Sequence, residues 1–189
     1  MKHYSFNLCT IVSTFVLLAT RAIEYRDYKR GDQFNNLLFN SECPGRKGIP
    51  CYVAVDTDKG PQAVIGFISM TIPKALTKTQ DAAVRAHMRD PKKKGAFGYI
   101  DYVSKDASRI GDLIDCVEVS SDFRRRGIGT KLVDYSIELG RGTAGVIGMT
   151  LLVSEQDKEA VALYKKLGFL NVLSKLGYEE DLELYALYF

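Results

Sequence analysis

The sequence is short of the residues from which metal sites are built. It contains four cysteines and two histidines, and no two cysteines have the C-x-x-C spacing. Structural zinc sites draw four cysteine or histidine ligands from closely spaced pairs. The sequence therefore argues against a zinc ion, and we expect no metal cofactor.

Cys43 and Cys51 flank a Pro-Gly-Arg-Lys-Gly turn, which would let the two thiols approach each other. Disulfides are rare in the cytosol. The cytoplasmic location argued below therefore favours free thiols, although the sequence alone leaves the pairing open.

The sequence also lacks a hydrophobic run long enough to cross a bilayer as a helix. The apolar stretch over residues 8–19 is shorter than the roughly 20 residues that a span requires, and we expect no membrane partner. With a lysine before it and Thr20-Arg21-Ala22 after it, the stretch has the outline of a secretory signal. If residues 1–22 act as a signal peptide, the protein is exported.

A folded N-terminus is the alternative that we favour. Tyr4, Phe6 and Leu8 alternate with polar residues, as in a half-buried strand. Apolar residues then keep a helical period through the supposed cleavage site, at Phe15, Leu18, Ala19, Ala22 and Ile23. We therefore expect a strand, then a helix, in a cytoplasmic protein.

No strong charge bias is present. The formal net charge is +3, which suits an anionic ligand such as a phosphorylated cofactor but falls short of a nucleic-acid-binding surface. With 46% hydrophobic and 26% charged residues, the composition is that of an ordinary globular protein. A chain of 189 residues suits a single domain with a continuous core.

The first half of the chain predicts a hairpin more clearly than anything else. Two β-rich runs, over residues 51–56 and 63–72, are joined by Asp58-Lys59-Gly60-Pro61, and Pro73 is expected to end the second strand. Less clear patterns predict a short helix over 34–40, a helix over 80–89, a charged turn over 91–95 and a strand over 99–103.

The second half alternates strands and helices. Strands are expected over 113–119, 145–154, 169–173 and 182–189, and helices over 130–139 and 155–167. A strand–helix–strand–helix order implies an α/β sheet with at least one parallel crossover.

One loop in this half has the chemistry of a phosphate site. The strand ending in Val117-Glu118-Val119 leads into Arg124-Arg125-Arg126-Gly127-Ile128-Gly129, and a helix follows. The two glycines remove β-carbons where a backbone must approach a bulky anion. The helix start offers unpaired N–H groups and the positive end of its dipole, and the arginines with Lys131 add charge. A pyrophosphate is therefore the expected ligand.

The helix that follows this loop also has a predicted apolar face. Ile128, Leu132, Val133 and Ile137 supply that face, which would fix the helix on the sheet.

Two common nucleotide motifs are excluded. A Walker A loop needs a lysine directly after its last glycine, and Thr130 follows Gly129. The literal G-x-G-x-x-G over residues 140–145 follows a helix and precedes a strand, which is the reverse of the dinucleotide fingerprint. We interpret it as a helix stop and a turn.

The loop and a second segment together resemble the GNAT superfamily of N-acetyltransferases. The R-x-x-G-x-G loop after a V-x-V strand is similar to that family's cofactor loop. Residues 160–169, Ala-Val-Ala-Leu-Tyr-Lys-Lys-Leu-Gly-Phe, resemble its A-x-x-L-Y-x-K-L-G-F helix and turn. Both motifs in this order make the resemblance specific over residues 113–170.

The resemblance implies a GNAT-like α/β fold: a mixed, mostly antiparallel twisted sheet of about six or seven strands, with a central parallel pair and flanking helices. The whole chain would be one N-acetyltransferase domain. Residues 1–72 would form the opening strand, two helices and a hairpin, 74–110 an insertion, 113–170 the acetyl-CoA-binding core, and 171–189 the closing strands.

The resemblance also implies the cofactor contacts. The backbone of Val117 and Val119 would pair with the pantetheine arm of acetyl-CoA, and the amides of the loop would hold the pyrophosphate. The residues expected to contact the cofactor are Val117, Val119, Arg124, Arg125, Arg126, Gly127, Ile128, Gly129, Thr130 and Asp157.

Asp157 stands where the family usually has an asparagine that contacts the cofactor arm. As a carboxylate it would meet the arm only as an acceptor. Ser154-x-x-Asp157 also has the pattern of a helix N-terminal capping pair, with an acid favoured by the dipole. We prefer the capping role.

Tyr164 matches the family tyrosine that protonates the departing CoA thiolate. A phenol within hydrogen-bond reach of that sulfur can donate to it. With Ala160, Leu163 and Leu167, the same tyrosine also falls on an ordinary core stripe at helical spacing. Both roles are compatible, because a tyrosine can bury its ring and present its hydroxyl to a cleft.

A base must also deprotonate the incoming amine. Family members often carry it on the cofactor strand, four or six residues before the final valine. Counting back from Val119 gives Asp115 and Leu113, so Asp115 is the candidate. Glu118 has the opposite parity and should face away, and a bridging water stays open as the base.

The expected function is transfer of an acetyl group from acetyl-CoA to a primary amine by direct attack. The amine would belong to a small molecule, a protein amino group or an aminoacyl-tRNA, and a homodimer is left open. The alternative is a catalytically weak sensor or scaffold protein in which a GNAT-like domain binds coenzyme A.

Overall fold

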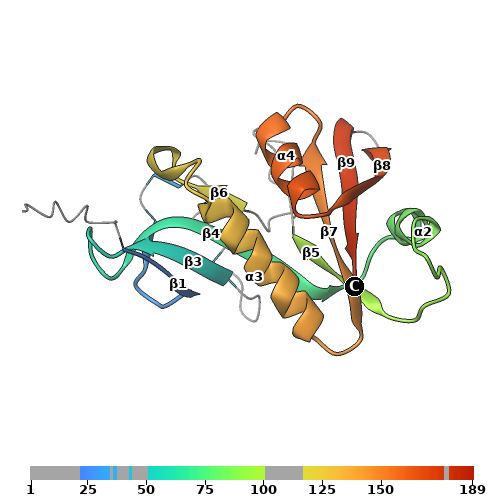
Figure 1. The fold of residues 1–189 in the computed structure, drawn as a ribbon, viewed down its shortest axis with the longest axis horizontal. Helices are drawn as coiled ribbons and strands as arrows, with labels where there is room; N and C mark the ends of the chain where they lie inside the picture. Colours follow the sequence, from blue (N-terminus) through green and yellow to red (C-terminus); the bar gives the residue numbers. More distant parts are fainter. Residues whose placement is uncertain (1–21, 35, 38–42, 44–50, 101–116, 177–178) are drawn as a thin grey trace, which may run out of the picture.

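The computed structural model describes residues 22–34, 36–37, 43, 51–100, 117–176 and 179–189. These residues form one nine-stranded sheet with three α-helices (Figure 1). The strands are β1 (Ile23–Asp27), β2 (Gln33–Phe34), β3 (Cys51–Asp56), β4 (Ala63–Lys74), β5 (Ala96–Ile100), β6 (Val117–Val119), β7 (Val146–Ser154), β8 (Leu170–Leu176) and β9 (Glu179–Tyr188). The helices are α2 (Lys78–Ala86), α3 (Ile128–Gly142) and α4 (Lys158–Lys166), and a short 3₁₀ turn spans Ser121–Phe123.

The sheet is mixed and mostly antiparallel, as predicted. Its order is β1-β3-β4-β5-β7-β9-β8, and β2 and β6 also pair with β4. The central parallel pair is β5 with β7, while the two-residue β2 runs parallel to β4. The described strands exceed the expected six or seven because β2 is a short addition and because β5 and β6 are two separate strands along one edge of β4.

β5 and β6 follow one another along this edge of β4. Ile100, at the end of β5, is in register with Met70, and Val117, at the start of β6, is in register with Ile68. The β4 partners of Ile100 and Val117 are therefore only two positions apart. The predicted strands over 99–103 and 113–119 are confirmed only through their outer parts, because residues 101–116 lie outside the described residues.

The main core lies between the sheet and α3. Ile128, Leu132, Val133 and Ile137 are at most 5% exposed, which confirms the apolar face predicted for this helix. They pack with Ile68, Met70, Met149 and Leu151 from the sheet. Figure 1 shows α3 crossing the sheet, with α4 near the β7 end. This packing fixes the start of α3 over β6.

A second apolar cluster lies between α2 and the sheet. Val84 of α2 is fully buried and packs with residues of β5, β7, β8 and β9, including Phe97 and Leu184. The helix expected over 80–89 is thus confirmed, starting two residues earlier at a Thr77 cap that forms a capping box with Gln80. The charged turn that follows it is also confirmed.

The N-terminal prediction was wrong where the structure describes it. Ile23 was assigned to a helix, but it lies in β1 and is in register with Asp56 of β3. Phe34 was assigned to a second helix, but it lies in β2 beside Val64. In both cases strand pairing with distant residues overrides a local helical period. Ala22, Asn36 and Leu37, which were also assigned to these helices, are not helical either. The other residues of both predicted helices, and the strand over 4–8, lie outside the described residues.

Several element boundaries also differ from the prediction: α2 ends at Ala86, β8 continues to Leu176 and β9 begins at Glu179. β4 continues through Pro73 to Lys74, because the β4–β5 register shifts between Thr71 and Lys74, and such an irregularity tolerates a missing N–H. Helix α3 begins at Ile128 and runs through Gly142, so the glycines at 140 and 142 belong to the helix. Helix α4 begins at Lys158, three residues later than predicted.

The expectation of free thiols at Cys43 and Cys51 was also wrong, because the two residues form a disulfide. Their Cα atoms are 5.4 Å apart, within the range that a disulfide bridges. Both residues belong to an apolar cluster with Val53, Val55 and Phe67. This bond fastens Cys43 to the start of β3.

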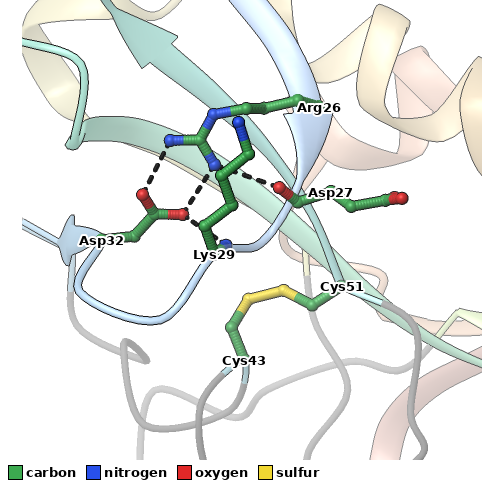
Figure 2. The surroundings of a disulfide bond; sticks show 6 residues. All are labelled: Arg26, Asp27, Lys29, Asp32, Cys43 and Cys51. Atoms are coloured by element: carbon green, nitrogen blue, oxygen red, sulfur yellow. Dashed lines mark hydrogen bonds and ion pairs between the residues drawn. A yellow bond between two sulfur atoms is a disulfide. The ribbon is translucent and has the colours of Figure 1, made fainter.

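An ion pair lies beside this disulfide (Figure 2). Arg26 donates to both carboxylate oxygens of Asp32, at 2.7 and 2.8 Å, and the backbone N–H of Lys29 donates to Asp32 at 2.8 Å. The Asp32 side chain is only 1% exposed. Burial raises the pKa of Asp32, but these hydrogen bonds and the nearby positive charges outweigh it and lower the pKa overall. The pair fixes the turn between β1 and β2.

Candidate functional site

A cleft of about 800 Å³ opens between β6, the start of α3 and α4. Its size is typical of ligand sites. One wall consists of Val117, Glu118, Val119, Phe123, Arg124, Arg125, Gly127, Ile128, Gly129 and Thr130. The other consists of Gln156, Asp157, Lys158, Glu159, Ala160, Leu163 and Tyr164. The structure therefore brings the two sequence motifs together around one space.

The cleft exists because β6 and β7 do not pair within the described residues. β5 pairs with β7 only as far as Ile100 and Leu151. Further along the sheet, the last residues of β7 pair with β9, and β6 pairs with β4. The second edge of β6 is thus left facing the cleft.

The backbone of Val117 and Val119 points to this open edge. Ser120 N–H donates to Ile65 O of β4 at 2.8 Å. Because the C=O and N–H of one trans peptide point in opposite directions, the carbonyl of Val119 points away from β4. In a strand, alternate residues present their backbone groups to the same edge. Val117 and the N–H of Val119 can therefore pair with an extended ligand in the cleft, whereas the Val119 carbonyl accepts from Arg124. The predicted contacts with a pantetheine arm stay a prediction.

The N-terminus of α3 carries no side-chain cap, whereas Thr77 and Asp157 cap α2 and α4. The first intrahelical bond joins Lys131 N–H to Gly127 O, so the amides of residues 128–130 have no acceptor within the helix. Gly127 has a φ of +78°, a left-handed conformation that glycine adopts without cost. The loop thus presents a row of N–H groups and a helix dipole to an anion.

The three arginines have three different side-chain positions. Arg124 Nε donates to Val119 O at 3.1 Å, and Arg125 forms an ion pair with Glu159 at 2.6 Å. The Arg126 guanidinium donates to Asp122 O at 2.9 Å and lies 5.1 Å from the centre of the Phe123 ring. Only Arg124 and Arg125 line the cleft.

Lys131 was expected to add charge for phosphates, and the structure corrects this. Its Nζ lies 4.8 Å from the centre of the Tyr25 ring, and it does not line the cleft. On a helix that begins at Ile128, Lys131 lies one turn inside, on the side that faces β1 rather than α4.

Asp157 is the N-cap of α4, which confirms the preferred role. Its carboxylate accepts from Ala160 N–H at 3.1 Å. The capping pair itself was wrongly assigned, because Ser154 Oγ instead accepts from Gln156 N–H at 3.2 Å, in the turn before the helix. Asp157 still lines the cleft, so one of its oxygens is committed to the helix while the residue borders the ligand space.

Tyr164 is a core residue that also borders the cleft. It is 7% exposed, packs edge-on against Phe169 with ring centres 5.9 Å apart, and belongs to the main core with Ala160 and Leu163. It also lines the cleft. The predicted core stripe is therefore confirmed, and the role as an acid stays a prediction.

Asp115, the candidate for the base that deprotonates the amine, lies outside the described residues. Its predicted role stays a prediction. Glu118 is in register with Phe67, whereas its neighbours Val117 and Val119 pack against the main core. The opposite parity predicted for Glu118 is thereby confirmed, since paired residues share a face of the sheet.

Within the described residues, no group of three or more His, Cys, Asp and Glu side chains is arranged so that it could hold a metal ion. No helix in the described part of the chain is long and apolar enough to cross a membrane.

Residues 17–169 match the model of the acetyltransferase (GNAT) family, and the chain belongs to this family. The match identifies the chain as a member of a family of acyl-CoA-dependent N-acyltransferases.

The peptidyl-lysine N-acetyltransferase YjaB of Salmonella typhimurium strain LT2 is similar in sequence. It is 37% identical over 59 residues, which are 31% of this chain and 37% of that protein. The chain thus spans little more than a third of the length of this relative.

Solved structures share the fold. Arabidopsis thaliana NAA60 in complex with a bisubstrate analogue has a TM-score of 0.63 at 19% identity, over 89% of this chain and 99% of that chain. The same protein in complex with acetyl-CoA has a TM-score of 0.60 at 19% identity, over 88% and 98%. At these identities the likeness establishes the architecture.

Several cleft residues were missed by sequence reasoning. Gln156, Lys158 and Glu159 precede or begin α4, and Ala160 and Leu163 were assigned only to a core stripe. The motif in α4 pointed to this helix, but only the packing of α4 beside the loop shows which of its residues border the ligand space.

Proposed function

We propose that this protein transfers the acetyl group of acetyl-CoA to a primary amine by direct attack of the amine on the thioester. The observation that carries the proposal is the cleft in which an open strand edge, an uncapped helix N-terminus and a buried tyrosine meet. The strand edge matches the amide-bearing arm of acetyl-CoA, the helix N-terminus matches its pyrophosphate, and the tyrosine matches its thioester sulfur.

The chain's residues would act as follows. Val117 and Val119 would hold the pantetheine arm through their backbone groups, and the amides of residues 128–130 would hold the pyrophosphate. The attack forms a nitrogen–carbon bond and breaks the carbon–sulfur bond. Tyr164 would donate its hydroxyl proton to the departing thiolate and recover it from solvent.

The amine must lose a proton during this step. We propose Asp115 as the acceptor of that proton, directly or through a water. Glu118 is the competing carboxylate, and its register places it on the opposite face from Val117 and Val119. Asp115→Asn and Glu118→Gln would separate the two candidates. Replacing the true base should lower kcat and shift the acid limb of the pH profile, whereas replacing the other carboxylate should do neither.

A protein amino group is the acceptor class that we propose first. The sequence relative is named a peptidyl-lysine acetyltransferase, and the NAA60 neighbour was solved with a bisubstrate analogue. Small-molecule amines and aminoacyl-tRNA are the competing classes.

The test is a turnover assay with acetyl-CoA and a panel of lysine peptides, peptides with free N-termini, small amines and aminoacyl-tRNA. Release of the CoA thiol and the mass of the acetylated product are measured together. The proposal expects amine-dependent thiol release that is lost in Tyr164→Phe. Tight CoA binding with no thiol release on any amine would instead support the sensor or scaffold function.

The compartment is a separate proposal. A supply of acetyl-CoA favours the cytoplasm, whereas the Cys43–Cys51 disulfide favours an oxidising compartment. We propose the cytoplasm because the reaction requires its donor there. An N-terminus at or near Ile23 in the mature protein would overturn this location in favour of export.

A further inference from the structure

One ion pair spans the mouth of the cleft. Arg125, in the loop before α3, donates to Glu159, in the first turn of α4, with 2.6 Å between Nη2 and Oε1. Both residues line the cleft, and their side chains are 83% and 66% exposed. The pair therefore links the two walls at their solvent side.

Within the described residues, Arg125 is the arginine of the loop that forms an ion pair with a residue of α4. Arg124 binds the Val119 carbonyl, and Arg126 turns back to Asp122 and Phe123. Arg125 itself has a φ of +60°, a conformation that is uncommon for a residue with a β-carbon. The backbone thus accepts some strain where it places Arg125 at the rim.

The position of the Arg125–Glu159 pair along the cleft indicates which part of the cofactor would lie beside it. Tyr164 is five residues after Glu159, which is about 8 Å along a helix axis, and it is buried whereas Glu159 is exposed. The thioester end of a ligand belongs near the tyrosine, and the amides of α3 account for a pyrophosphate. The rim is left for the remaining phosphate of coenzyme A, which the ribose carries at the end far from the thioester.

We propose that Arg125 recognises the 3′-phosphate of the cofactor. Before the cofactor binds, Glu159 holds the Arg125 guanidinium at the mouth of the cleft, and it releases the guanidinium when the cofactor binds. This rests on the proposed function. An exposed ion pair contributes little to stability, whereas a guanidinium binds a phosphate dianion through two parallel hydrogen bonds. The exchange of partners is therefore favourable, and Glu159 weakens cofactor binding by the small amount needed to break the pair.

The state of Glu159 supports this exchange. The hydrogen bond from Arg125 and the charges of Arg125 and Arg124 lower its pKa. The carboxylate is therefore ionised at neutral pH and competes directly with a phosphate for the same donor.

The experiment compares the affinities of coenzyme A and dephospho-coenzyme A by calorimetric titration. The full chain is compared with Arg125→Gln and Glu159→Gln, each checked by thermal unfolding. We expect the unmodified chain to prefer coenzyme A by about 10-fold, from one charge-assisted contact. Arg125→Gln should bring this preference close to one, and Glu159→Gln should tighten coenzyme A binding several-fold while leaving the dephospho form almost unchanged.

A matched pair provides the control. Arg141 and Glu138 form another exposed ion pair, at 2.9 Å with side chains 52% and 69% exposed, at the far end of α3. Arg141→Gln and Glu138→Gln remove the same charges and should leave the preference unchanged.

Three outcomes would overturn the proposal. If the unmodified chain binds both ligands equally, or if Arg125→Gln keeps the preference, the 3′-phosphate has another partner and the proposed function stands. If the unmodified chain binds neither ligand, the proposed function fails as well.

Discussion

The Nε atom of Arg124 lies 3.1 Å from the carbonyl oxygen of Val119 and donates to it. Arg124 is the first residue of the glycine-rich loop, and Val119 is the last residue of β6. The hydrogen bond therefore fastens the loop to the strand edge at which the pantetheine arm is proposed to bind. Arg124 acts in this arrangement through a backbone carbonyl rather than through a phosphate.

Replacing Arg124 tests this role. Arg124→Met removes the donor, and we expect about a 10-fold loss of coenzyme A affinity because the loop loses its fixed position. Arg124→Gln removes the charge but keeps an N–H donor, and it should retain most of the affinity. Calorimetric titration measures both. Equal losses in the two variants would show that the charge matters and that the contact to Val119 does not.

Tyr164 is expected to serve chemistry rather than binding. Tyr164→Phe keeps the buried ring and its contact with Phe169, so the free energy of unfolding should change by only about 1 kcal/mol. The affinity for coenzyme A should be unchanged, while kcat falls by about 100-fold or more with the loss of the acid. Steady-state kinetics and calorimetry separate the two effects. A variant with full kcat would remove Tyr164 from the mechanism.

Gly127 can be tested against a glycine of the same conformation. Gly127 and Gly145 have φ values of +78° and +80°, and an added β-carbon meets nothing within 4 Å at either position. Alanine at each site should cost about 1 kcal/mol of stability from backbone strain alone. Only Gly127→Ala should also weaken coenzyme A binding, because Gly127 lines the cleft and Gly145 does not. Equal affinities in the two variants would argue against a phosphate site in this loop.

Which of these features the sequence predicts depends on how local they are. The loop, the apolar face of α3 and the Asp157 cap involve residues close in the chain, and their patterns predicted them. Arg125 and Glu159 are 34 residues apart, and they meet only because the loop before α3 and the first turn of α4 border the same cleft. No sequence period carries that information.

The wrong predictions at the N-terminus also concern contacts between residues that are distant in the sequence. Ile23 continues a helical period in the sequence, but it pairs with Asp56 in the sheet. Strand formation depends on partners that are distant in the chain, so a local pattern misleads where such a partner exists. The Cys43–Cys51 pairing was misjudged for another reason: it was inferred from the expected compartment, whereas the structure brings the two residues together.

The ion pair between Asp32 and Arg26 should make the free energy of unfolding depend on pH. The lowered pKa of Asp32 means that its contribution to stability is present above the unfolded value of about 3.9 and is lost as the pH falls through the lower folded value. Asp32→Asn should therefore cost about 3 kcal/mol at pH 7, because it leaves Arg26 partly buried without its partner. As the pH falls below the unfolded value and through the lower folded value, the difference from the unmodified chain should shrink. Urea unfolding over a series of pH values from 7 downward measures this, and a difference that stays constant across the series would exclude the ion pair as its source.

The disulfide is also open to a direct test. Peptide mapping without reductant should recover Cys43 and Cys51 in one linked species. Reduction should lower the free energy of unfolding by about 2–3 kcal/mol, as expected for closure of a short loop. The variant with serine at both positions should show no such response to reductant. Full thiol labelling of both cysteines in the protein as isolated would contradict the bond.

Hydrogen exchange with and without saturating acetyl-CoA tests the central claim most directly, because it locates the donor in the chain. The claim is that the donor occupies the cleft between β6, the start of α3 and α4. We expect slower exchange on binding in residues 117–130 and 156–164, with little change in the β1–β2 turn held by Arg26 and Asp32. Protection confined to other segments, or none at saturation, would contradict the account.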